Sequence, residues 1–173
     1  GGSYLLAKAL HDEIKLVTEQ PVRLVLNENG QGHAMLGNSY WADQGVKTMA
    51  HVDAAEEFAE SGAQSLRGAQ SRLLERADGT QVVLPDETFE DVYRIEFGDL
   101  EIGVLHLSPS HSPGDIVIWM PEQSLVIAGD IAFHERLLPI FEDTITIDWL
   151  ETWKHGFEPL QATYVIPGHG HPT

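Results

Sequence analysis

Two residues in the middle of the chain, His111 and Asp130, are of types that bind metal ions, and each is placed where it can face a cleft. His111 lies in a loop, residues 108–114, whose two prolines and glycine fix an irregular backbone. Asp130 follows an apolar run by two residues. Imidazole and carboxylate groups are both zinc ligands, so the pair indicates a metal site. The simpler alternatives are that Asp130 caps the following loop and that His111 is held by its own turn without metal.

These two residues must be positioned by strands. The apolar runs 115–120 and 124–128, joined by a turn at 121–123, predict a strand pair that carries Asp130 at its end. We predict that both runs share one sheet with a strand at 100–107, which follows a tight turn at Gly98 and Asp99. His111, Asp130 and a later histidine, His169, each end a strand or begin a loop, which predicts that they converge at one sheet edge.

The remaining elements follow from apolar periodicity and turn residues. A helix capped by Ser3 buries Leu6, Leu10, Ile14 and Val17, with His11 on its solvent face, and a long helix is capped by Asp53. Trp149 and Trp153 are core residues of a helix at 148–157. The other predicted elements are strands at 22–26, 46–50, 81–84, 91–97 and 162–166, helical turns at 38–44, and the long helix at 53–77.

Three short motifs resemble those of the metallo-β-lactamase superfamily, whose chains carry a His-Thr-x-Gly turn, a hairpin ending Ala-Gly-Asp and a later Pro-Gly-His-Gly. This chain has His-Ser-Pro-Gly at 111–114, Ala-Gly-Asp at 128–130 and Pro-Gly-His-Gly at 167–170, in the same order. The resemblance covers nearly the whole chain. It implies an α/β fold, a metallo-β-lactamase-like αββα sandwich of two mixed β-layers, in a single domain over residues 1–173.

The family's first ligand cluster, His-x-His-x-Asp-His, is degenerate here. Residues 29–34 read Asn-Gly-Gln-Gly-His-Ala. Asn29, Gln31 and Ala34 therefore occupy the positions of histidines, and His33 occupies the position of an aspartate. Amides bind zinc poorly beside imidazole or carboxylate, and alanine supplies no ligand atom.

The resemblance consequently implies a reduced metal site. The candidate ligands are His111, Asp130, His169 and His33, with His171 as an alternative to His169. These are too few for two ions, so we expect at most one zinc ion, or an empty site. His33 is either a ligand or a hydrogen-bonding group that fills the vacated space. In an active enzyme, His33 or an outer residue would have to act as the catalytic base in place of the lost aspartate.

The net charge and the composition of this 173-residue chain argue against several classes of partner. The formal net charge of −17, with only ten Lys and Arg, argues against nucleic acid and anionic membrane surfaces as partners. No apolar run is long enough for a membrane helix. The absence of cysteine excludes disulfides and zinc-thiolate sites. The charge itself points to no partner, and the metallo-β-lactamase resemblance implies a small-molecule substrate or ligand.

Relative to the family, the sequence lacks the first strand hairpin and the closing helix. A sheet without its outer strands exposes an edge, which predicts a homo-oligomer as one possible assembly. Two functions remain open. One is a one-metal hydrolase acting on an ester, thioester or lactam. The other is an inactive binding module that uses the vestigial cleft.

Overall fold

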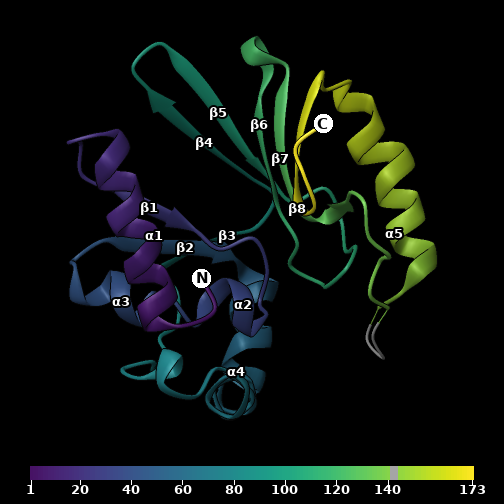
Figure 1. Ribbon diagram of the computed structural model, residues 1–173. Coiled ribbons are helices and arrows are strands. Elements are labelled where there is room, and N and C mark those ends of the chain that lie inside the picture. Colours follow the sequence, from purple (N-terminus) through teal and green to yellow (C-terminus); the bar gives the residue numbers. More distant parts are fainter. Residues whose placement is uncertain (141–143) are drawn as a thin grey trace. The chain divides into compact units, whose positions relative to one another are not determined.

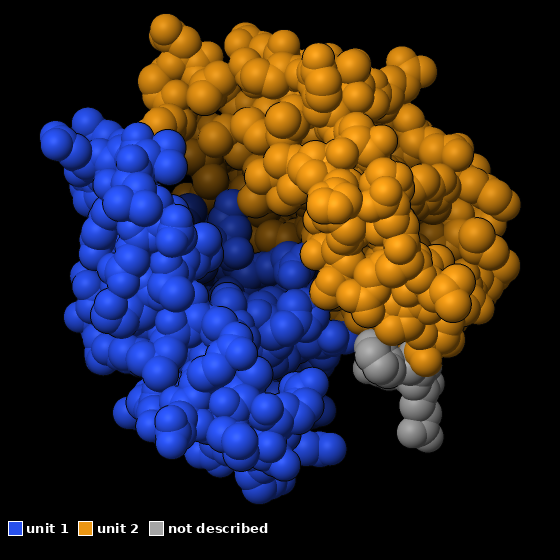
Figure 2. Space-filling view, viewed as in Figure 1, with its two compact units in different colours: residues 1–88 blue, residues 89–173 orange. Residues whose placement is uncertain are grey.

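The computed structural model describes residues 1–140 and 144–173 (Figure 1). The chain forms two compact units, unit 1 with residues 1–88 and unit 2 with residues 89–173 (Figure 2). A three-stranded sheet has the order β1-β2-β3, and a five-stranded sheet has the order β4-β5-β6-β7-β8. Within the described residues, no helix is both long and apolar enough to cross a membrane.

The helices of unit 1 are α1 (Tyr4–Val17), α2 (Gly32–Met35), α3 (Asn38–Asp43) and α4 (Val52–Leu73), and the strands are β1 (Leu24–Leu26), β2 (Lys47–His51) and β3 (Glu87–Phe89). The predicted strand at 81–84 is wrong, because these residues lie outside any strand. Pro85 follows them and has no N–H to donate to a ladder. Pairing with β2 begins at Asp86, whose N–H donates to the carbonyl oxygen of Thr48 at 2.9 Å.

The two long helices of unit 1 begin at side-chain caps. The predicted cap of α1 is confirmed, since Ser3 Oγ accepts a hydrogen bond from the backbone N–H of Leu6 at 3.2 Å. The predicted cap of α4 is wrong. His51 takes that position, and its Nδ1 accepts from the N–H of Asp53 at 3.2 Å. A buried histidine at the end of β2 thus has a structural role.

The predicted buried face of α1 is also wrong in part. Leu10 and Val17 are exposed, whereas His11 is half-buried. His11 Nδ1 lies 2.8 Å from the hydroxyl oxygen of Tyr40, and the His11 ring lies 5.0 Å from that of Trp41. The aromatic pair on α3 therefore selects the face of α1 that packs, and an imidazole with a polar partner fits there better than leucine.

Unit 2 contains β4 (Val92–Phe97), β5 (Leu100–Leu105), β6 (Val117–Met120), β7 (Leu125–Phe133) and β8 (Tyr164–His169), with α5 (Thr146–Thr152) continuing as a π-helix over Trp153–Phe157. Strands β4 to β7 are antiparallel neighbours, and β8 runs parallel to β7. The prediction that 100–107, 115–120 and 124–128 share one sheet is confirmed.

The core of unit 2 forms where the helix that begins with α5 packs on the sheet (Figure 1). Phe157 is buried against Val117, Val126 and Ala128, and Trp153 packs at the margin of this cluster. Burying these side chains anchors the helix beside β7 and β8. β7 carries Asp130 and β8 carries His169, two residues of the candidate site.

Candidate metal centre

Three side chains of unit 2 converge as the sequence predicted. His111 Nε2 lies 3.8 Å from Asp130 Oδ2, and His169 Nε2 lies 3.4 Å from Asp130 Oδ1. The side chains of His111 and Asp130 are 1% and 3% exposed, whereas that of His169 is 39% exposed. A buried carboxylate thus lies between two imidazoles, and the centre opens to solvent on the side of His169.

Asp130 is placed by an irregularity in β7. The sequence predicted this residue two positions beyond a strand, but it lies within β7. The register with β8 passes from Gly129 opposite Pro167 directly to Phe133 opposite His169, so β7 bulges between these pairs. Gly129 has φ +54°, a conformation that glycine adopts at little cost. Bulges redirect side chains, and this one turns Asp130 toward the end of β8.

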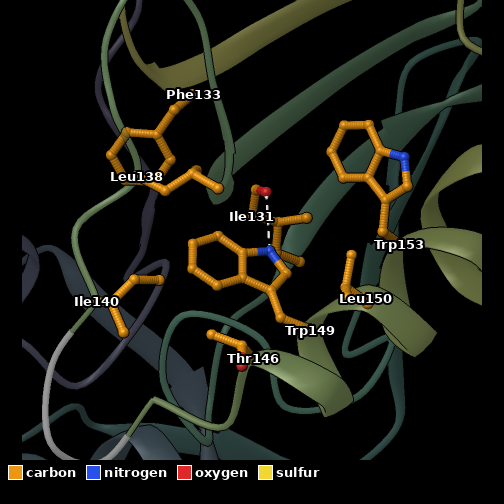
Figure 3. A pocket seen from close by; sticks show the side chains of 8 residues that line it. All are labelled: Ile131, Phe133, Leu138, Ile140, Thr146, Trp149, Leu150 and Trp153. Atoms are coloured by element: carbon orange, nitrogen blue, oxygen red, sulfur yellow. Dashed lines mark hydrogen bonds between the residues drawn. The ribbon is translucent and has the colours of Figure 1, made fainter.

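Trp149 on α5 supports the bulge. Its indole Nε1 donates to the carbonyl oxygen of Ile131 at 3.1 Å, a bond shown in Figure 3. The bulge removes this carbonyl from the regular ladder, and a buried carbonyl needs a donor. The Trp149 ring also meets the ring of His111 edge-on, at 5.6 Å. The tryptophan expected only in the core therefore contacts both the bulge and a candidate ligand.

The loop that carries His111 is held by Asp115. Asp115 Oδ2 accepts from the backbone N–H of Ser112 at 2.6 Å, and Oδ1 accepts from the Ser112 hydroxyl at 2.9 Å. The Thr152 hydroxyl on α5 donates to the carbonyl oxygen of Pro109 at 2.9 Å. Sequence reasoning assigned Asp115 only to a strand. The Ser-x-x-Asp spacing of residues 112–115, typical of side-chain caps, was the available signal.

We expect Asp115→Ala to lower the free energy of unfolding by about 3 kcal/mol, because two hydrogen bonds to a buried charged acceptor are lost. Urea denaturation measures the change. Asp99→Ala, at an exposed turn, is the matched control and should change stability by less than about 0.5 kcal/mol. Equal effects of the two substitutions would show that Asp115 does not hold the loop.

The glycine before His169 has a steric function. A Cβ at Gly168 would lie 2.5 Å from Asp130 Oδ1 and 2.6 Å from the carbonyl carbon of Gly129. Gly170 has φ +99°, and a Cβ there would overlap the backbone of His134. The Pro-Gly-His-Gly segment therefore needs both glycines, the first so that β8 can approach the carboxylate of Asp130.

Gly168→Ala should consequently displace the Asp130 carboxylate. We expect zinc affinity to fall about 10–100-fold, the range found when the orientation of a ligand is disturbed. Competition with a chromophoric chelator measures the affinity. Gly68→Ala on α4, where a Cβ meets nothing within 4 Å, is the control and should leave zinc affinity unchanged. Unchanged affinity in Gly168→Ala would contradict the proposed role of Asp130.

A family model described as the metallo-beta-lactamase superfamily matches residues 33–169, most of the chain and all three candidate ligands of unit 2. The chain belongs to the metallo-β-lactamase superfamily. The membership inferred from the three motifs is thereby confirmed.

Solved structures of metallo-β-lactamases share the fold. The chain matches a metallo-β-lactamase from Pontibacter korlensis with a TM-score of 0.72 and 18% identity, covering 95% of this chain and 69% of that one. It matches IND-7 with a TM-score of 0.72 and 21% identity, covering 95% and 68%. It matches TMB-1 with a TM-score of 0.77 and 15% identity, covering 99% and 71%. The expected metallo-β-lactamase-like α/β fold is confirmed.

Members of the metallo-β-lactamase superfamily typically bind zinc, and the residues of unit 2 fit such an ion. Tetrahedral zinc with bonds of about 2.0–2.2 Å holds its ligand atoms about 3.3–3.6 Å apart. His169 Nε2 lies 3.4 Å from Asp130 Oδ1, within this range, and His111 Nε2 lies 3.8 Å from the other carboxylate oxygen, Oδ2, slightly above it. Two imidazoles and one carboxylate are also a donor set of a common zinc type. His111, Asp130 and His169 would be the ligands.

Arg136 and Phe133 border the solvent-facing ligand. Phe133 stacks on the ring of His169, with centroids 5.0 Å apart and planes inclined by 20°. Arg136 Nη1 lies 3.0 Å from His169 Nδ1, and its Cζ lies 5.8 Å from the Phe133 centroid. A guanidinium only donates, so Nδ1 accepts and the ring proton lies on Nε2, which faces Asp130. His169 would hold zinc through Nε2, the nitrogen that faces Asp130.

The degenerate metallo-β-lactamase segment lies in unit 1. Asn29 is buried, and its Oδ1 accepts from the backbone N–H of Gln31 at 3.0 Å, so the amide closes its own loop. His33 lies on α2, with its side chain 42% exposed and its Nε2 3.2 Å from Glu28 Oε1. The role of His33 as a ligand or base stays a prediction. The side chain of His171, the alternative ligand, is 86% exposed, and its Nε2 lies 3.9 Å from Glu135 Oε2.

Proposed function

We propose that this chain is a metal-dependent hydrolase that holds one zinc ion with His111, Asp130 and His169. The observation that carries the proposal is the buried Asp130 carboxylate, which has an imidazole nitrogen near each oxygen. Such a carboxylate balances the charge of a cation in a site that excludes most water. The exposed side of His169 leaves room for a substrate and for water, as a catalytic zinc site requires.

The substrate class is an ester, a thioester or a lactam. Zinc, when bound, lowers the pKa of water to near neutrality and polarises a carbonyl group. In hydrolysis, the oxygen of water bonds to the carbonyl carbon, the bond to the leaving oxygen, sulfur or nitrogen breaks, and a proton passes to that leaving atom. Asp130 and His111 are held rigidly by the bulge and by the Asp115 loop, which preorganises the centre.

The one-metal form of the proposal rests on residues 29–34. A two-metal centre needs ions about 3.5–4 Å apart, each with several ligands. Asn29 is a neutral amide whose oxygen already accepts a loop hydrogen bond, and Ala34 has no ligand atom. Apart from His33, the segment supplies no imidazole that could hold another ion.

His33 is proposed as an additional ligand or as the general base, and His33→Ala separates these roles. Loss of a ligand should lower zinc affinity about tenfold or more. Loss of a base should leave affinity unchanged and lower kcat about 100-fold or more. His155→Ala, which removes a 76% exposed imidazole, is the matched control. A variant with unchanged affinity and unchanged kcat would exclude both roles.

A binding module without metal is the second candidate. The contact between Arg136 and His169 favours it, because Asp130 then faces a ring nitrogen that already carries a proton. In that case the cleft would hold an organic ligand, and zinc would not raise any hydrolytic rate.

The deciding experiment compares metal-free and zinc-supplemented protein with three substrates, p-nitrophenyl acetate, a thioester and a chromogenic cephalosporin. We expect hydrolysis of at least one substrate only with zinc, with loss of the rate on adding a chelator. Absence of hydrolysis above background with zinc would contradict the hydrolase, and absence of zinc binding as well would favour the binding module.

A further inference from the structure

Unit 2 contains an apolar pocket beside the metal centre (Figure 3). Its volume is about 450 Å³, within the range of about 300–1,000 Å³ for small-molecule sites. The walls come from the end of β7, the segment after it and α5, and the lining residues are Ile131, Phe133, Leu138, Ile140, Thr146, Trp149, Leu150 and Trp153. Among the residues that the structure describes, this lining includes no charged side chain.

The two indole N–H groups of the described lining already have hydrogen-bond partners, and Thr146 adds one hydroxyl group. The indole N–H of Trp149 donates to the carbonyl oxygen of Ile131, and that of Trp153 donates to Glu158 at 3.2 Å. The lining thus offers dispersion contacts and apolar burial rather than hydrogen bonds. A charged or strongly hydrated group would lose its solvation there without a partner.

Two walls of the pocket are shared with the metal centre. Phe133 stacks on His169, and Trp149 meets the ring of His111 edge-on at 5.6 Å. A molecule that fills the pocket would therefore contact the two aromatic rings that pack on the imidazoles of His169 and His111. This continuity distinguishes the pocket from an isolated apolar patch on the surface.

We propose that the pocket binds the aliphatic acyl chain of a neutral ester or thioester and that the carbonyl end of this substrate reaches His111, Asp130 and His169. The proposal rests on the hydrolase function and names its substrate class. The apolar lining disfavours lactams whose anionic group would have to enter the pocket, because that group would lose its hydration there. Short acyl groups should be poorer substrates, because they leave the apolar walls in water.

The test uses octanamide, a neutral acyl-chain analogue that resists hydrolysis, with acetamide as the short control. Of the four tryptophans, two line the pocket and Trp41 lies in unit 1. In nitrogen–proton correlation spectra, octanamide should shift the indole signals of Trp149 and Trp153 and leave that of Trp41 in place. Acetamide should shift none of them.

A pair of neighbouring leucines supplies the matched variants. Leu138 lines the pocket, whereas Leu137 is 91% exposed and does not. Leu138 is 48% exposed but forms part of the apolar wall, so Leu138→Asp should weaken octanamide binding more than about tenfold, because the acyl chain would meet a charged, hydrated group in place of leucine. Leu137→Asp should bind octanamide as the unmodified protein does. The titration of the unmodified protein remains decisive if Leu138→Asp does not fold.

Several outcomes would overturn the pocket proposal. The first is that octanamide leaves the indole signals of Trp149 and Trp153 unshifted. The second is that Leu138→Asp and Leu137→Asp weaken octanamide binding equally. The third is that the protein forms a dimer that Leu138→Asp dissociates, while octanamide does not bind. Zinc-dependent hydrolysis of p-nitrophenyl acetate without octanamide binding would refute the pocket alone. Octanamide binding without any hydrolysis would refute the hydrolase alone.

Discussion

Asp130→Asn is expected to weaken zinc binding more than about 100-fold, since removing a direct ligand should exceed the 10–100-fold losses that follow changes around ligands. Asparagine keeps the shape of the side chain, so the bulge in β7 can persist. The charge that balances the cation is lost, and a neutral amide is a poor zinc ligand. Asp130 is the residue that faces both imidazoles, at 3.8 and 3.4 Å.

Competition with a chromophoric chelator measures this affinity. Asp99→Asn makes the same chemical change at an exposed turn and should bind zinc as the unmodified protein does. A zinc affinity of Asp130→Asn within about threefold of the unmodified protein, well below the expected loss, would mean that the ion is held elsewhere.

Trp149→Ala is expected to have the largest effect on stability, a loss of about 4 kcal/mol in the free energy of unfolding. Trp149 is 6% exposed, and its removal leaves a cavity beside His111 and Phe133. It also leaves the buried carbonyl of Ile131 without its donor. Zinc affinity should fall as well, because the bulge that orients Asp130 loses its support.

Trp153→Ala is the control, since it removes the same side chain from the continuation of the same helix. Trp153 stacks on Phe157 at 4.6 Å and is only partly buried. This variant should lose some stability and keep its zinc affinity. Urea denaturation and chelator competition on both variants provide the comparison. An equal loss of zinc affinity in both would attribute the effect to general destabilisation.

Much of the fold could be predicted because apolar periodicity is local. Each strand of the five-stranded sheet was predicted, since each run alternates or is continuously apolar between turn residues, but β7 and β8 extend to Phe133 and His169, beyond the predicted ends at 128 and 166. The errors arose from packing partners distant in sequence. His11 packs because Tyr40 and Trp41 meet it, and the strand expected at 81–84 fails because pairing with β2 starts at Asp86.

In the candidate site, too, some residues could be predicted from the sequence and others could not. His111, Asp130 and His169 could be found from short motifs, and the structure brings them together. The groups that position them were missed. Trp149 acts on a carbonyl 18 residues away in sequence, and no local pattern reveals such a contact. Gly168 leaves space for the carboxylate of Asp130, which a Cβ at this position would approach to 2.5 Å, and only the three-dimensional structure shows this contact.

The zinc content of the unmodified protein tests the central claim most directly. The protein is loaded with zinc, dialysed against metal-free buffer and analysed for zinc per chain by mass spectrometry, with Asp130→Asn treated in parallel. One zinc ion per chain in the unmodified protein and none in Asp130→Asn is the result that a one-metal centre at His111, Asp130 and His169 predicts. Two retained zinc ions per chain, or none, would contradict it.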